Sequence, residues 1–175
     1  ARHPRHVPDR AAGERLMPLG DAGRGRRDPN TEAIEDYAKA IYAIAGEREG
    51  EGPVLNGEVA QRLGVTPATA TSMLKRLADL GLVDYVPYKG VSLTPAGEKV
   101  ALEVIRHHRL IEAYLSEALG MADDRVHEEA EVLEHYISEE LEALMAAKLG
   151  EPRHDPHGTP IPGPDLVPPT WGDAR

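Results

Sequence analysis

Apolar residues recur at steps of three and four in two stretches of the sequence, a spacing typical of helices that bury one face. The first stretch follows Thr31, a candidate N-cap, and the last begins after Asp123 and Asp124 and ends at Gly150. The stripes comprise Ile34, Tyr37, Ala38, Ile41 and Ala45 in the first stretch, and Val126, Ala130, Leu133, Ile137, Leu141 and Leu144 in the last. Each stretch predicts one helix, and the last is expected to run without a break.

Two short helices joined by a tight turn are predicted after the first stretch. Asn56 is a candidate cap of the first short helix, and Gly64 permits the turn that follows it. Thr66 is placed to cap the second, with Pro67 at its first position and Gly81 after its end. The inward-facing residues are Val59, Ala60 and Leu63 in the first and Met73, Leu74, Leu77 and Leu80 in the second. Two helices joined this closely form a helix-turn-helix.

A hairpin and a long helix follow the helix-turn-helix. The run LVDYVPYKGVSLT predicts two short strands around a turn at residues 88–90. Thr94 and Pro95 then begin a helix that runs to about Leu119. A hairpin in this place is a wing, so the expected fold class is mainly α, with an N-terminal winged helix-turn-helix followed by a helical domain. Such a unit over residues 54–98 is expected to bind double-stranded DNA.

The second helix of the pair is expected to lie in the major groove, where its first turn meets the bases. Here that turn is small and polar. The candidate DNA contacts are Thr66, Thr69, Thr71, Ser72, Lys75, Arg76 and, at the tip of the wing, Lys89. The alternative is a scaffold or protein-binding module. Because residues 54–100 carry five basic and four acidic residues, one copy should bind DNA weakly, and a homodimer through the helices after residue 95 would double the contacts.

The acidic charge of the chain is concentrated towards its C-terminal end. The formal net charge is −10, and residues 101–175 hold 16 acidic residues against six basic ones, together with six of the eight His. Carboxylates and imidazoles together suggest a divalent cation as partner, and the absence of Cys limits its ligands to oxygen and nitrogen. With no apolar run of roughly eighteen residues and no signal peptide, we expect a cytoplasmic protein without a membrane partner.

The run VHEEAEVLEHY places four candidate ligands on one face of the last helix, because they stand at positions i, i+4, i+7 and i+8. These ligands are His127, Glu131, Glu134 and His135. On the preceding helix, His108 and Glu112 repeat the i, i+4 pair. Antiparallel packing of the two helices would join this pair to His127 in one cluster and leave the other three ligands for a second. The alternative is a solvated face of charged residues that binds no metal.

Several motifs together resemble one known family over roughly residues 31–165. They are IEDYAKAIY in the first helix, the winged unit, HHRLIEAYL, VHEEAEVLEHYISEE and, in the tail, HGTPIPG. The family is that of the diphtheria toxin repressor and the manganese transport regulator, which are metal-dependent transcriptional regulators. The resemblance implies a regulatory metal site at Asp36, Glu131, Glu134 and His135 and a second site at His108, Glu112 and His127.

The same resemblance bears on the metal. Iron-responsive members typically have Met in place of Asp36 and Cys in place of Glu131. Oxygen ligands at these two positions, in place of sulfur ligands, favour a harder metal ion. We therefore expect Mn2+, with Fe2+ or another divalent transition metal as the alternative. Members with a closely spaced metal pair have a further Glu where this chain has Lys39, so that pair is not expected here. Longer members carry an SH3-like C-terminal domain that completes the second site, and we expect that this domain has been lost or trimmed.

These observations predict a homodimeric repressor of metal-uptake genes, in which Mn2+ joins the DNA-binding unit to the dimerisation unit on a palindromic operator. The expected divisions are a flexible basic arm at residues 1–29, a winged helix-turn-helix domain at 30–100, a helical dimerisation and metal-binding domain at 101–150, and a Pro-rich tail at 151–175. The tail is expected to be an extended linker or a docking strap rather than a folded unit.

Two other classes of function are alternatives to this one. A winged-helix regulator that senses an organic ligand or a protein partner is the first, but 4% aromatic residues and no Phe offer little for a pocket, so no small organic substrate is expected. A di-metal carboxylate enzyme is the second, and it would need Glu-x-x-His motifs on paired helices. Val132 and Asp124 stand three residues before His135 and His127, so we expect no enzyme.

Overall fold

The structure is a computed structural model that describes residues 29–48 and 52–168. Residues 1–28 of the predicted arm and residues 169–175 of the predicted tail lie outside the described residues. The elements in chain order are α1 (Pro29–Glu47), α2 (Asn56–Arg62), α3 (Pro67–Asp79), β1 (Val83–Val86), β2 (Gly90–Leu93), α4 (Pro95–Ala113), the π-helical turn η1 (Tyr114–Ala118), α5 (Asp123–Leu133) and α6 (Glu139–Lys148). None of the described helices is both long and apolar enough to cross a membrane.

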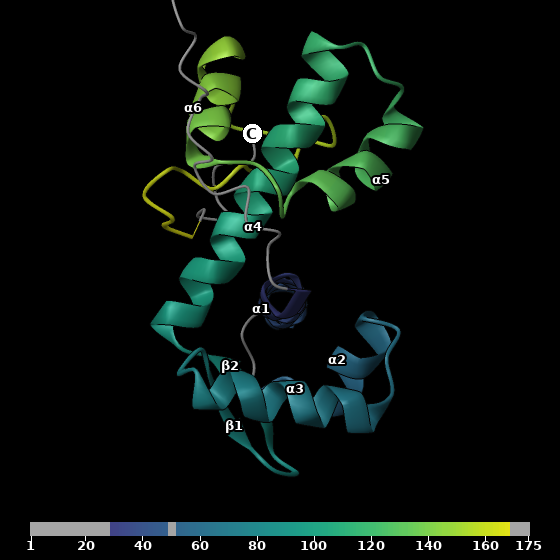
Figure 1. Ribbon diagram of the computed structural model, residues 1–175, viewed down its shortest axis with the longest axis vertical. Helices are drawn as coiled ribbons and strands as arrows, with labels where there is room; N and C mark the ends of the chain where they lie inside the picture. The colour runs from purple at the N-terminus through teal and green to yellow at the C-terminus, as the bar shows by residue number, and fades with distance from the viewer. Residues whose placement is uncertain (1–28, 49–51, 169–175) are drawn as a thin grey trace, which may run out of the picture.

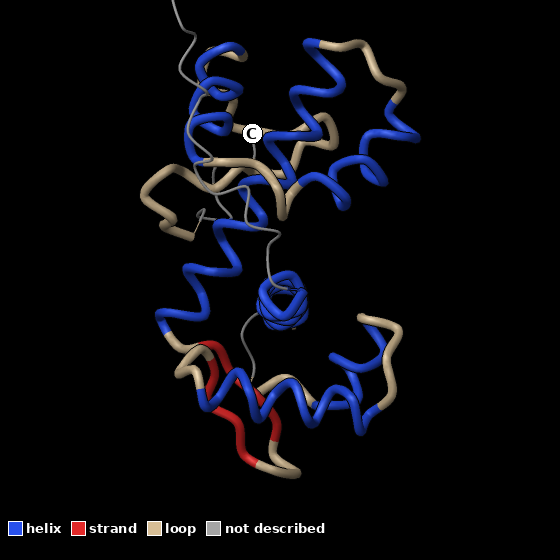
Figure 2. The backbone as a smooth tube through the Cα atoms, in the orientation of Figure 1, coloured by secondary structure: helices blue, strands red, loops and turns tan. Residues whose placement is uncertain are grey.

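The winged helix-turn-helix lies at one end of the molecule, and it confirms the predicted fold class (Figures 1 and 2). The Thr66 hydroxyl accepts a hydrogen bond from Thr69 N at 3.1 Å, and Pro67 occupies the first position of α3, as predicted. The buried core of this unit comprises Tyr37, Ile41, Ile44, Val54, Val59, Ala60, Ala70, Leu74, Leu77, Val83 and Val91. Apolar residues from α1, α2, α3 and the hairpin therefore share one core.

The wing is an antiparallel hairpin in which Val86 pairs with Gly90 at the turn end. Val54, just before α2, adds a bridge to Val91 with both N–O distances at 2.8 Å. A Cβ at Gly90 would lie 2.6 Å from Val54 O, so this close approach requires glycine. The wing is thereby fastened to the helix-turn-helix.

Helix α4 connects the winged unit to the rest of the molecule (Figure 1). The Thr94 hydroxyl accepts a hydrogen bond from Gly97 N at 3.2 Å, and Pro95 stands at the first helical position, as predicted. A Cβ at Gly97 would lie 1.9 Å from Leu82 O, so only glycine lets α4 pack this closely against the hairpin. Figure 1 shows α1 end-on between α3 and α5, and α1 packs against α4.

A second core lies among α4, η1, α5 and α6. Its buried members are Leu110, Ile111, Leu115, Val126, Ala130, Ile137, Met145 and Ala146. The tail docks on the same part of α4, because Arg106 donates a hydrogen bond to Pro162 O at 2.7 Å and Arg109 donates to Pro160 O at 2.5 Å. Of the two alternatives for the tail, the structure shows the docking strap over residues 151–168.

The prediction of one unbroken last helix is wrong. Helix α5 ends at Leu133, the chain turns through residues 134–137, and α6 follows Ser138, whose hydroxyl accepts a hydrogen bond from Leu141 N at 3.2 Å. The serine cap satisfies a backbone donor that a continuous helix would bond to its own carbonyl. Because α6 is a separate helix, Leu141 and Leu144 do not continue the buried stripe of α5 and are 45% and 62% exposed.

Two predicted helix caps are also wrong. Helix α1 begins at Pro29, so Thr31 lies inside it; proline suits a first turn because its missing N–H has no helical partner there. Helix α2 is preceded by Leu55, whose N–H donates to the Glu58 carboxylate at 2.8 Å. Asn56 donates instead from its side-chain amide to a hydroxyl of α3 at 2.7 Å. It therefore ties the two helices of the helix-turn-helix together.

Candidate functional site

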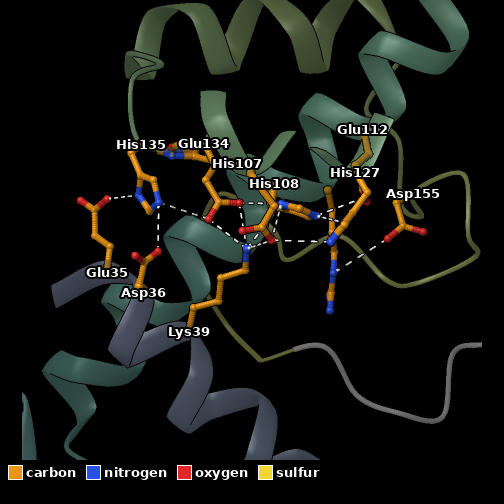
Figure 3. Close-up of polar contacts among 12 residues, drawn as sticks. Glu35, Asp36, Lys39, His107, His108, Glu112, His127, Glu134, His135 and Asp155 are labelled. Carbon is orange, nitrogen blue, oxygen red and sulfur yellow. Dashed lines mark hydrogen bonds and ion pairs between the residues drawn. The ribbon is translucent and has the colours of Figure 1, made fainter. Parts of the chain in front are cut away.

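The candidate metal ligands meet where α1 approaches the turn after α5 (Figure 3). Asp36 of α1 and Glu134 and His135 of this turn each bring one ligand atom to within 4.8 Å of the other two. His135 Nε2 lies 3.1 Å from Asp36 Oδ1 and 3.5 Å from Glu134 Oε1. This first cluster contains three of the four residues expected at the regulatory site.

The second cluster joins His108 and Glu112 of α4 to His127 of α5. Glu112 Oε1 lies 3.1 Å from both His108 Nε2 and His127 Nδ1. The Glu112 side chain is 3% exposed, whereas that of His127 is 61% exposed. The three residues expected at the second site are therefore together. The Glu112 carboxylate is buried, and the exposed His127 imidazole lies between it and solvent.

Glu131, expected at the regulatory site, lies beside the second cluster instead. Its Oε1 atom is 3.8 Å from both His108 Nδ1 and His127 Nε2. Lys39 of α1 stands between the clusters, and its ammonium group donates hydrogen bonds of 2.9 Å to Glu131 and to both oxygens of Glu134 (Figure 3). A side-chain cation therefore already balances the carboxylates of this region.

Two imidazoles of the site have a raised pKa. Burial by itself lowers the pKa of His135, but hydrogen bonds with Asp36 and Glu35 outweigh burial and raise it to about 10. Burial likewise opposes protonation of His108, and hydrogen bonds with carboxylates, that of Glu112 first, raise the pKa of this ring. Since a metal ligand must be the neutral imidazole, a metal ion at either cluster would replace a proton.

The donor sets fit a divalent metal ion. Both clusters combine carboxylate oxygen with imidazole nitrogen, which are ligands of Mn2+, Fe2+ and Zn2+ in proteins. Ligand atoms that share an ion at roughly 2.1 Å lie roughly 3.0–3.5 Å from one another. The distances of 3.1 and 3.5 Å in the first cluster and 3.1 Å in the second fall in that range. An ion in the first cluster would have to displace the Lys39 ammonium group from the Glu134 carboxylate.

The predicted DNA contacts lie on α3 and the wing. Thr66, Thr69, Ser72, Lys75, Arg76 and Lys89 are exposed, and Thr71 is half-buried. The Thr71 hydroxyl donates to Pro67 O at 2.8 Å, so this group is already engaged within the helix. Tyr88, which the sequence analysis did not include among the contacts, is fully exposed at the tip of the wing with a positive φ of 66°. Ser72, Lys75 and the wing tip are therefore exposed to solvent.

Sequence reasoning missed two partners of the clusters. Glu35 Oε2 lies 2.6 Å from His135 Nδ1, but its position in the sequence has no helical spacing relative to the other ligands. His107, which was assigned no role, is buried between Glu134 O at 3.1 Å and Glu142 Oε2 at 3.0 Å. Its significance depends on the packing of α6 against α4, and no local pattern reports that packing.

Comparison with known proteins identifies the family. Residues 30–91 match the family described as Iron dependent repressor, N-terminal DNA binding domain, and residues 94–163 match Iron dependent repressor, metal binding and dimerisation domain. The transcriptional regulator MntR of Salmonella typhimurium is 40% identical over 116 residues, which cover 66% of this chain and 71% of that protein. The diphtheria toxin repressor of Corynebacterium glutamicum is 35% identical over 132 residues, which cover 75% of this chain and 57% of that protein.

Solved structures agree with this assignment. A manganese-dependent transcriptional repressor in complex with manganese matches with a TM-score of 0.70 and 44% identity, over 78% of this chain and 62% of that chain. ScaR with bound Zn2+ matches with a TM-score of 0.65 and 37% identity, over 74% of this chain and 59% of that chain. This chain thus spans less than two thirds of either solved chain. It belongs to the iron-dependent repressor family, the metal-dependent transcriptional regulators that include MntR and the diphtheria toxin repressor.

Proposed function

We propose that this chain is a Mn2+-dependent, DNA-binding transcriptional repressor that acts as a homodimer. The first cluster carries the proposal, because Asp36 belongs to α1 of the winged unit whereas Glu134 and His135 belong to the helical unit. When bound there, a divalent ion supplies the positive charge and ligand bonds that join the two units. The three side chains then hold α3 at one orientation to the dimer instead of many.

Mn2+ is the proposed ion on two grounds. The first cluster offers two carboxylates and one imidazole, and hard oxygen ligands suit Mn2+. The relatives include MntR and a manganese-dependent repressor solved with manganese. Fe2+ or another divalent transition metal is the competitor, because Mn2+ stands low in the general order of affinities. Glu131, at 2.9 Å from Lys39, would add a third carboxylate once that lysine moves aside.

A homodimer is proposed from the surface of the helical unit. Exposed apolar side chains on and between α5 and α6 are Val132, Leu133, Tyr136, Leu141 and Leu144, with exposures from 38% to 63%. Large exposed apolar side chains are enriched where contiguous patches form an interface, and the matching family domain is described as a dimerisation domain. A second copy would present two α3 helices to successive major grooves, about 34 Å apart, which suits a palindromic operator.

The proposed DNA-binding part extends over residues 30–100 and the proposed dimerisation and metal-binding part over residues 101–150. In the cytoplasm, the dimer would bind operators of metal-uptake genes when Mn2+ is plentiful and so repress them. A hundredfold rise in operator affinity needs about 2.7 kcal/mol of differential metal binding between the two arrangements of the units. A metal site with ligands on both units can supply this free-energy difference. The complete set of ligands exists only when the units are held together, so metal binds that arrangement more tightly.

Titration of DNA with and without Mn2+ tests the proposal. An operator is first selected from random double-stranded DNA with the wild-type chain and Mn2+, and an unselected sequence serves as the reference. We expect Mn2+ to raise the wild-type affinity by about a hundredfold and to have little effect on Asp36→Ala. Glu47→Ala is the matched control, because Glu47 is also on α1 but pairs with Arg62 at 2.6 Å on the surface.

Two results would count against the proposal. An undiminished Mn2+ response in Asp36→Ala would reject the first cluster as the regulatory site. Selective DNA binding that is indifferent to Mn2+, Fe2+, Co2+ and Zn2+ would instead indicate a regulator that senses an organic ligand or a partner.

A further inference from the structure

A largely apolar groove lies in the winged unit, apart from the metal clusters. It has a volume of about 890 Å³ and is bounded by α1, the wing and the start of α4. Its apolar lining includes Ile41, Ala45, Val54, Val91 and Leu93, and none of the described lining residues is a candidate metal ligand or DNA contact. Binding pockets typically have volumes of roughly 300–1,000 Å³. The groove is therefore large enough to take a bulky side chain and the backbone that carries it.

The tail leads to this groove. Pro168 is the last residue that the structure describes, and of the described lining residues it alone belongs to the tail. Earlier in the tail, Arg106 of α4 donates a hydrogen bond to Pro162 O at 2.7 Å, and the Ile161 side chain is buried. The tail is thus fixed on the helical unit and, a few residues later, reaches the edge of a groove in the winged unit.

The residues after Pro168 include an anchor for the groove. Seven residues follow Pro168, and among them is the only Trp of the chain, Trp171. An extended chain covers at most roughly 3.6 Å per residue, so Trp171 can lie up to about 10 Å from Pro168. A buried Trp removes roughly 150–250 Å² of surface from water, which favours docking. The N-terminal arm joins α1 at Pro29, about 20 Å along the helix from Tyr42 in the groove, so it begins farther away.

The groove also offers an acceptor for an indole N–H. Glu98 is half-buried in its lining. Burial and then the negative charge of Glu98 raise the pKa of Tyr42, which lines the same groove. The N–H of a buried Trp usually finds a hydrogen-bond partner. Apolar walls beside one carboxylate therefore suit an indole better than an aliphatic side chain.

We propose that residues 169–175 dock in this groove with Trp171 as their anchor, so that the tail fastens the helical unit to the winged unit. The docked tail is a further connection between the units besides α4. It restricts the orientations of the winged unit in the metal-free chain, since the contact involves no ligand of either cluster. This inference goes beyond the proposed function, and its test needs neither metal nor DNA.

Fluorescence quenching tests the proposal, because the chain has one Trp and no Cys and so accepts one label at one position. Bimane on Gly46→Cys, at an exposed position of the groove, loses its emission when an indole touches it. We expect this loss in the full chain, and we expect Trp171→Phe to restore the emission. Glu140→Cys, exposed on α6, is the matched label position, where Trp171→Phe should change nothing. Equal emission from Gly46→Cys with and without Trp171 would overturn the proposal.

A mixing experiment separates docking within one chain from docking between two copies. The labelled Gly46→Cys chain that also carries Trp171→Phe is mixed with unlabelled wild-type chain. Emission that stays unchanged on mixing supports docking within one chain. Quenching that appears only in the mixture would mean that a second copy supplies the indole, and it would overturn the proposal.

Blocking the groove gives an independent measurement on the unlabelled chain. Ser92→Arg places a long charged side chain at an exposed position of the groove, so iodide should then quench Trp171 as it does in the urea-unfolded chain. Asp84→Arg is the matched control, because Asp84 is exposed, pairs with Ser92 across the hairpin and does not line the groove. It should leave Trp171 shielded. Equal shielding of Trp171 in the two variants would contradict docking in this groove.

Discussion

The Lys39 ammonium group lies 2.9 Å from both carboxylate oxygens of Glu134, a residue 95 positions further along the chain. The Glu134 side chain is fully buried, and that of Lys39 is 22% exposed. The same ammonium group donates to Glu131 at 2.9 Å. A lysine of α1 therefore neutralises the carboxylates through which the two units meet, and it links the units in the absence of metal.

Removing this lysine should weaken the metal-free protein. Lys39→Met removes the ammonium group from the buried Glu134 carboxylate and leaves only imidazoles beside it, so we expect the free energy of unfolding to fall by about 2 kcal/mol in the presence of a chelator. The apparent affinity for Mn2+ should rise, because an ion no longer competes with the ammonium group. Urea denaturation and metal titration measure the two effects. Lys99→Met, at an exposed position of α4, is the control; equal stability of the two variants would refute the structural role of Lys39.

Metal binding should release protons near neutral pH. The pKa of His135 is raised to about 10, so in the folded, metal-free chain the ring is protonated at pH values where an unfolded histidine is neutral. Its contribution to stability is complete below the unfolded pKa of about 6.5 and is lost as the pH rises through about 10. Because Mn2+ requires the neutral ring, its affinity should increase by up to about tenfold per pH unit in that window.

Calorimetric titration of Mn2+ in buffers of different ionisation enthalpy measures this proton release. Glu35→Gln replaces one of the two carboxylates that hold the proton on His135 with a neutral amide, so fewer protons should be released at neutral pH. A Mn2+ affinity that is flat between about pH 6.5 and 8.5 would speak against displacement of a proton.

The buried network around Glu142 should hold the backbone of Glu134, and so the first cluster, in position. Glu142 accepts from Arg106 Nε at 2.5 Å and lies 3.0 Å from His107 Nε2, while His107 Nδ1 lies 3.1 Å from Glu134 O. Glu142→Ala leaves the buried guanidinium without its anion and should cost about 3 kcal/mol of stability. Because the backbone of Glu134 loses support, metal affinity should fall by about tenfold.

Chemical denaturation and Mn2+ titration check both parts of this expectation. Glu140→Ala is the control, since Glu140 is exposed on the same helix. If Glu142→Ala matched that control in stability and in metal affinity, the network would have no supporting role.

Lys75 and Ser72 should separate DNA affinity from DNA specificity. Both are exposed on α3. We predict a phosphate contact for Lys75, so Lys75→Ala should weaken binding to all sequences and reduce the slope of log K against log salt by about 1. Ser72→Ala should instead change the preferred base at one operator position, seen by repeating the selection from random DNA. A normal salt slope for Lys75→Ala, with Lys99→Ala as reference, would remove Lys75 from the interface.

Local sequence alone determined the helix-turn-helix, the wing and the type of ligand. The caps at Thr66 and Thr94 are satisfied by N–H groups three residues further on, so neighbouring residues suffice to predict them. The pair His108 and Glu112 stands one helical turn apart for the same reason. Features that depend on helical period or on adjacent residues were therefore readable before any tertiary contact was known.

Tertiary packing decided how those ligands are grouped and what surrounds them. The break after Leu133 turns Glu134 and His135 towards α1 and leaves Glu131 with the imidazoles of the second cluster. The position of Lys39 beside these clusters follows from contacts between segments far apart in the chain. Helical period relates residues within one helix, whereas the distance between side chains of different elements depends on packing of the whole core, which no local pattern encodes.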